Sequence, residues 1–121
     1  MSNNIVHYTV MKGTQFKKFE NFSLELRRGA IVLAVLSRLG DPQYGYSLKK
    51  RLTETGFAVE EGTLYPLLRR LESQGLLASR WLIKQSRPRR YYQISPLGKQ
   101  LLDKLTSEWN QLTEVIERIL Q

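Results

Sequence analysis

The chain has 121 residues, a length typical of one domain, and 41% of them are hydrophobic, which is enough for a modest core. The absence of cysteine excludes disulfides and thiolate metal sites, and no apolar run is long enough for a transmembrane helix. The net charge is +8, and residues 99–121 hold three basic and four acidic side chains, so the excess lies within residues 1–98. That excess favours a polyanionic partner, with simple solubility as the alternative.

The first segment, residues 1–22, is interpreted as an N-terminal arm. It interleaves Phe16, Phe19 and Phe22 with two lysines. The three-residue spacing fits one face of a helix or an arm that packs on a partner subunit, and the pattern does not separate the two. No charged start followed by a long apolar run is present, so we expect no secretory signal and a cytoplasmic location.

Two helices are expected between residues 23 and 56. Ser23 is a suitable N-cap for the first helix, which should end at Gly40. Its apolar residues recur at helical spacing: Leu24, Ile31, Val32, Val35, Leu36 and Leu39. The second helix should follow Pro42 and stop at Gly56, with Tyr44, Leu48 and Leu52 on one side. Three basic residues lie on its outer side: Lys49, Lys50 and Arg51.

A third helix is expected over residues 60–74, with Leu64, Leu68 and Leu71 directed inward. Pro66 interrupts this pattern, because proline lacks an N–H group and crowds the carbonyl four residues earlier. We therefore expect the helix to begin just before the proline. Bent first turns are the alternative.

A β-hairpin and a long helix complete the chain. In residues 79–84 and 90–94, side chains alternate between two faces, and a basic loop around Pro88 should join the two strands. Ser95 then caps a helix over residues 96–121, with Pro96 at its first position.

This order of elements predicts a mostly α fold with a small β-hairpin (α+β). It is typical of a winged helix-turn-helix domain, here residues 23–95, followed by a long C-terminal dimerisation helix over residues 96–121. In such domains the third helix enters the DNA major groove, and the hairpin, or wing, lies along the flanking backbone or minor groove.

Two stretches carry a family likeness: "GTLYPLLRRLESQGLL" (62–77) and, after a strand that contains tryptophan, "SRPRRYYQISPLGKQLL" (86–102). Together with Gly45-Tyr46 and "ELRRGAIVLAVL" (25–36), they resemble the PadR family of bacterial transcriptional regulators. The likeness covers roughly residues 24–120. It implies a homodimeric winged-helix repressor whose C-terminal helices pair across the dimer.

Candidate DNA contacts come from the second helix, the third helix and the wing. Arginine forks suit phosphate oxygens, and an arginine on the third helix can pair with guanine O6 and N7. Tyr65 could instead pack at the junction of helix and wing, and Arg70 could form a surface ion pair. The full set is Lys49, Lys50, Arg51, Thr63, Tyr65, Arg69, Arg70, Lys84, Arg87, Arg89 and Arg90.

The last helix carries an apolar stripe with alternating spacings of three and four residues. The stripe comprises Leu102, Leu105, Trp109, Leu112, Ile116 and Ile119. A seam of this kind favours pairing with a second copy, with folding back onto its own domain as the alternative. Trp109 is either a filler of that interface or, as the resemblance implies, a platform on which a flat aromatic ligand stacks.

The function expected from these features is sequence-specific, homodimeric DNA binding by a transcriptional repressor. Twofold symmetry favours a palindromic operator with half-sites about 34 Å apart or a multiple of that distance. The alternative is a small basic interaction or RNA-associated module without an operator. No nucleophile–base pair, metal-ligand cluster or phosphate-binding glycine loop is present, so we expect no enzyme activity, no metal and no cofactor.

Overall fold

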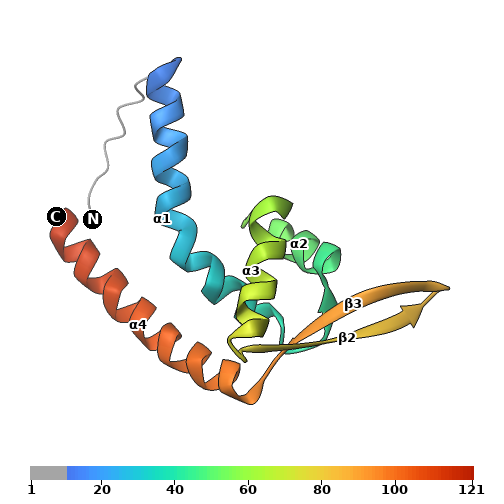
Figure 1. Ribbon diagram of the computed structural model, residues 1–121. Helices are drawn as coiled ribbons and strands as arrows, with labels where there is room; N and C mark the ends of the chain where they lie inside the picture. The colour runs from blue at the N-terminus through green and yellow to red at the C-terminus, as the bar shows by residue number, and fades with distance from the viewer. Residues whose placement is uncertain (1–10) are drawn as a thin grey trace.

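The computed structural model describes residues 11–121, so the first ten residues of the expected arm lie outside the described part (Figure 1). Within it, four helices accompany a three-stranded antiparallel sheet of order β1-β3-β2. The elements are α1 (Thr14–Arg38), β1 (Gln43–Tyr44), α2 (Gly45–Glu54), α3 (Glu61–Ser73), β2 (Leu77–Lys84), β3 (Arg87–Ile94) and α4 (Pro96–Leu120). The predicted fold class is confirmed.

One hydrophobic core joins the second half of α1, the inner faces of α2 and α3, and the base of the sheet. Leu64, Leu68 and Leu71 are buried as predicted, because spacings of three and four residues place them on one face of α3. They pack in one cluster with side chains from the neighbouring elements: Val35, Leu36, Leu39, Leu48, Leu52, Tyr92 and Ile94. We call this part of the molecule, residues 31–77 and 91–98, the head. From it α1 and α4 splay apart, and the β2–β3 hairpin projects on the opposite side (Figure 1).

The start predicted for the first helix was wrong. The helix α1 begins at Thr14, and Ser23 lies inside it rather than capping it. Gly13 precedes the helix with a φ of 61°, a conformation that glycine adopts without strain. The spacing of the three phenylalanines is therefore that of a helix face, and all three side chains are exposed.

The start predicted for the second helix was also wrong, because Tyr44 belongs to β1 and α2 begins at Gly45. The reason lies in Gln43, which is buried. Its amide Nε2 donates to the Arg38 carbonyl at 2.7 Å, and its Oε1 accepts from Ser47 Oγ at 3.1 Å. These bonds hold residues 43–44 extended beside β3, where Tyr44 pairs with Tyr91.

The helix α3 spans Glu61–Ser73, close to the predicted range 60–74. It begins more than one turn before Pro66, so the narrower expectation of a start just before the proline was wrong. The carbonyl that the proline ring crowds belongs to Gly62, which is exposed. Water can therefore satisfy that carbonyl, and the helix accommodates the proline near its N-terminal end.

The hairpin is longer and its turn tighter than predicted. Gln85 and Ser86, with φ of 55° and 60°, form the two-residue turn, a backbone that matches the twist of antiparallel strands. The basic residues that follow belong to β3, not to a loop. The register pairs Trp81 with Arg90 and Leu82 with Arg89, which confirms the predicted alternation of faces.

The junction between hairpin and α4 agrees with the prediction. Ser95 Oγ accepts from the Gly98 amide at 3.0 Å and donates to the Gly75 carbonyl at 2.6 Å. Gly98 is buried so closely that a Cβ there would overlap the Leu76 carbonyl oxygen and lie 2.7 Å from Ile94 Cγ1. This contact fixes the direction in which α4 leaves the head.

Candidate nucleic-acid interface

The exposed face of α3 follows directly from its buried leucines. At 100° per residue, the side opposite them carries Gly62, Pro66, Arg69 and Ser73, all of which are exposed. Tyr65 lies on one flank of this stripe, while Thr63 and Arg70 lie on the other. The predicted base-contacting residues therefore lie around the accessible side of the helix, with Arg69 between Tyr65 and the centre of that side.

Tyr65 packs at the junction of α3 with α2 and the sheet. The residue is half-buried, and a Cβ at Gly45 would overlap its ring, so the glycine is what admits the tyrosine. Burial raises the pKa of Tyr65, with Glu61 and Tyr92 adding to the effect. The phenol therefore stays protonated at neutral pH, and the packing role weighed for it in the sequence is present in the structure.

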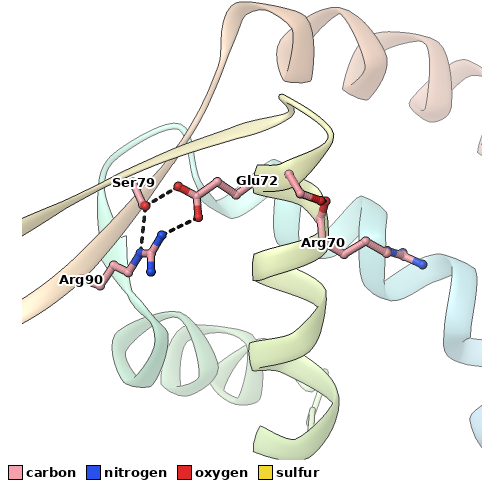
Figure 2. Close-up of polar contacts among 5 residues, drawn as sticks. Arg70, Glu72, Ser79 and Arg90 are labelled. Atoms are coloured by element: carbon pink, nitrogen blue, oxygen red, sulfur yellow. Dashed lines mark hydrogen bonds and ion pairs between the residues drawn. The ribbon is translucent and has the colours of Figure 1, made fainter.

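Arg90 ties the wing to α3 (Figure 2). Its Nη2 lies 2.8 Å from Glu72 Oε1, and its Nε donates to Ser79 Oγ at 2.9 Å. Ser79 Oγ in turn donates to Glu72 Oε2 at 2.5 Å. One carboxylate from α3 thus holds a side chain from each wing strand, so the guanidinium of Arg90 is already engaged. We call Glu72, Ser79 and Arg90 the clamp.

Arg89 lies on the other face of the hairpin, over an aromatic shelf. Its guanidinium carbon is 4.2 Å from the centre of the Tyr44 ring, which meets Tyr91 edge-on at 5.4 Å. Lys84 Nζ lies 5.0 Å from the centre of the Tyr91 ring. Cation–π contacts of this kind restrain a long basic side chain without neutralising its charge.

A cavity of about 560 Å³ opens between the wing, the start of α2 and α3. Its lining includes three arginines, Arg87, Arg89 and Arg90, and four tyrosines, and no carboxylate contributes to it. Tyr65 brings the flank of α3 to the same cavity. The combination of fixed positive charge and tyrosine rings suits phosphate groups and the sugars attached to them.

The remaining predicted basic residues are placed differently. Arg87 is exposed beside the turn and pairs with Lys84 across the hairpin. Of the α2 residues, Lys49 is half-buried, and Lys50 and Arg51 are exposed. None of these three lines the cavity beside the wing. Arg70 forms no ion pair within residues 11–121.

The apolar stripe of α4 divides into two parts. Leu102 and Leu105 pack against the head, as the folding-back alternative requires. Further along, the stripe is accessible in the single chain, with Trp109 46% and Ile119 68% exposed. Leu112 and Ile116 are also exposed.

Three residues that shape this surface were not predicted from the sequence. Tyr44 was assigned to a helix, Gly45 was noted only within a motif, and Glu72 was given no role. A carboxylate on α3 within a basic region was a usable signal for the Glu72–Arg90 pair. The approach of Tyr65 to Gly45, in contrast, depends on how α2 and α3 cross, and no local pattern reports it.

Comparison with known proteins places the chain among transcriptional regulators. Residues 32–104 match the model of the transcriptional regulator PadR-like family. The transcriptional regulator Rv3488 of Mycobacterium tuberculosis is 36% identical over 97 residues, which cover 79% of this chain and 88% of that protein.

Solved structures agree with this assignment. A PadR family transcriptional regulator from Eggerthella lenta is 44% identical, with a TM-score of 0.81, covering 88% of this chain and 95% of its own. A PadR-like transcription factor from Bacteroides fragilis is 33% identical, with a TM-score of 0.68, covering 82% and 98%. In the described part of the chain, no helix has the length and apolar character needed to span a membrane.

Proposed function

This chain belongs to the transcriptional regulator PadR-like family, and on that premise we propose that it regulates transcription by binding double-stranded DNA in the cytoplasm. The family is one of regulators, so the expectation that the chain is not an enzyme is confirmed. In the proposed complex, Arg69 and its neighbours on α3 enter the major groove, and the wing follows the flanking backbone.

The observation that carries this proposal is the convergence of α3 and the wing on one cavity whose lining includes Arg87 and Arg89, neither of which forms an ion pair within residues 11–121. The clamp supports it, because it holds the wing at a set position relative to α3. A rigid pair of elements can engage a groove and its backbone together without first being ordered, which lowers the entropic cost of binding.

Homodimerisation is the second part of the proposal. The exposed seam of α4 comprises Trp109, Leu112, Ile116 and Ile119. Contact with a second apolar surface would remove these side chains from water. The first half of α1 also exposes Phe16, Phe19 and Phe22. A second copy supplies matching faces, and its twofold axis favours a palindromic operator. Repression follows if the occupied operator blocks transcription.

Selection of bound duplexes from a random pool tests the proposal. We expect a motif with twofold symmetry and half-sites about 34 Å apart or a multiple of that distance. Substitution of Arg69 by alanine should relax the preference at one base position in each half-site, with a loss of about 1–3 kcal/mol at the preferred base. Equal or tighter binding of hairpin RNA in a parallel titration would favour the RNA-associated module instead.

Ligand gating is a separate proposal that rests on the exposed indole of Trp109 in the single chain. In a dimer, this ring would border the seam and offer a flat surface to a planar aromatic compound. Such a compound should quench tryptophan fluorescence and change the affinity for the operator. Because Trp81 also emits, Trp109→Phe is required as a control, and persistent quenching in that variant would argue against Trp109 as the platform.

A further inference from the structure

A second cavity lies on the flank of α3 that faces away from the wing. It has a volume of about 280 Å³ and is formed between α1 and α3. Thr63 and Arg70 border it from α3, and Arg28 borders it from α1. No function was predicted for Arg28 from the sequence. Ile31 and Val32, one turn further along α1, line the same cavity.

Two neighbouring arginines of α1 are used in different ways. Arg27 turns toward the head, where its Nη2 donates to the Ala58 carbonyl at 3.1 Å and its guanidinium lies 4.6 Å from the centre of the Phe57 ring. Arg28 is exposed, and neither it nor Arg70 forms an ion pair within residues 11–121. No carboxylate lines the cavity that they share. Two positively charged side chains thus line one cavity, and no carboxylate within residues 11–121 pairs with either of them.

The geometry of a DNA groove gives this flank a partner. The major groove is about 12 Å wide, and a helix with its side chains has a diameter of about 10–12 Å. A helix that lies in the groove therefore has a phosphate backbone on each side. Arg87 and Arg89 line the cavity beside the wing, on one side of α3. Arg28 and Arg70 line the second cavity, on the other side.

We infer that Arg28, together with Arg70, binds phosphates of the backbone that borders the groove on the side of α3 away from the wing. This inference rests on the proposed function and adds to it a contact from α1. It assigns each flank of α3 to one DNA strand. Arg69, which belongs to the exposed stripe and is on the side of Tyr65, remains between the two strands and free to meet base edges.

The test is a salt titration of the affinity of full-length Arg28→Ala for a duplex that the unmodified chain binds. Loss of one phosphate contact should reduce the slope of log affinity against log salt by about 0.9, with base preference unchanged. Arg28→Lys should retain most of the slope, because an ammonium still meets a phosphate as a point charge. Ethylation of individual phosphates should show the lost contact on one strand of each half-site.

Lys18→Ala is the matched control, since it removes the same charge from the exposed part of α1. Ten residues of helix separate it from Arg28 by about 15 Å, which exceeds the screening length of about 10 Å at 0.1 M salt. An unchanged slope in Arg28→Ala, or an equal reduction in Lys18→Ala, would overturn the inference. Failure of the unmodified chain to bind any duplex would instead overturn the proposed function, so the two failures are distinguishable.

Discussion

The head and the two long helices bury their apolar residues to very different extents. In the head, leucines from α1, α2 and α3 enclose one another and the base of the sheet, and several of them have no accessible surface. Beyond the head, the first half of α1 and the second half of α4 leave large apolar side chains exposed. The head therefore has its own core, whereas the two helices have apolar faces that residues 11–121 of a single chain do not cover.

The sharpest test of this contrast is the same substitution placed in both regions. Leu68→Ala removes a fully buried side chain and should lower the free energy of unfolding by about 2–5 kcal/mol. Leu26→Ala, at a site that is 85% exposed, should change it by less than about 0.5 kcal/mol. Urea denaturation of both variants measures the difference. Similar losses would mean that Leu26 is also buried in solution.

A charged side chain in the seam of α4 should weaken dimerisation without unfolding the head. Ile116→Asp places a carboxylate on the apolar face of α4 and should weaken the proposed dimer by at least about 2 kcal/mol. Sedimentation equilibrium should then show monomers, while the head keeps its fold and its near-ultraviolet circular dichroism. Glu117→Gln, on the neighbouring exposed position, is the control. A dimer that survives Ile116→Asp would place the interface elsewhere.

The clamp links the head to the wing, and its removal should have an intermediate effect. Glu72→Gln keeps the shape of the side chain but removes its charge. Because Arg90 is 40% exposed, we expect the free energy of unfolding to fall by only about 1 kcal/mol. Affinity for DNA should fall as well, since the wing loses its fixed position. Glu54→Gln on α2, an exposed carboxylate, should leave both quantities unchanged.

Substitutions at the free end of the wing should affect binding alone. Arg87→Ala should lower the salt slope of DNA binding by about 0.9 without altering the free energy of unfolding, because the side chain is exposed. Lys99→Ala, an exposed site on α4, provides the comparison at equal charge. A change in thermal stability in Arg87→Ala would show that this residue, like Arg90, has a structural role.

Arg89 offers the finest distinction within the wing. Tyr44→Leu removes the aromatic face under its guanidinium while keeping an apolar side chain. If the ring positions Arg89 for DNA, affinity should fall by about 0.5–1 kcal/mol. The same substitution should then have no further effect in an Arg89→Ala background. Additive losses in the double variant would indicate that Tyr44 acts independently of Arg89.

Local patterns in the chain were sufficient for several features. The leucine spacing of α3 placed its buried and exposed sides, the alternation in the hairpin separated its two faces, and Ser95-Pro96 marked the start of α4. Each of these depends on residues within a few positions of one another, which is the range over which helix and strand periodicity act.

Other features were decided by residues that are distant along the chain. Arg90 meets a carboxylate 18 residues away, Tyr44 pairs with Tyr91, and Gln43 is held by the end of α1. Arginines that look alike in the sequence therefore have different contacts in the structure. Arg90 is part of the clamp, Arg89 rests on a tyrosine, and Arg28 borders a cavity with Arg70. Side-chain periodicity cannot distinguish among these arginines, because each one meets its neighbouring groups only when the helices pack against the sheet.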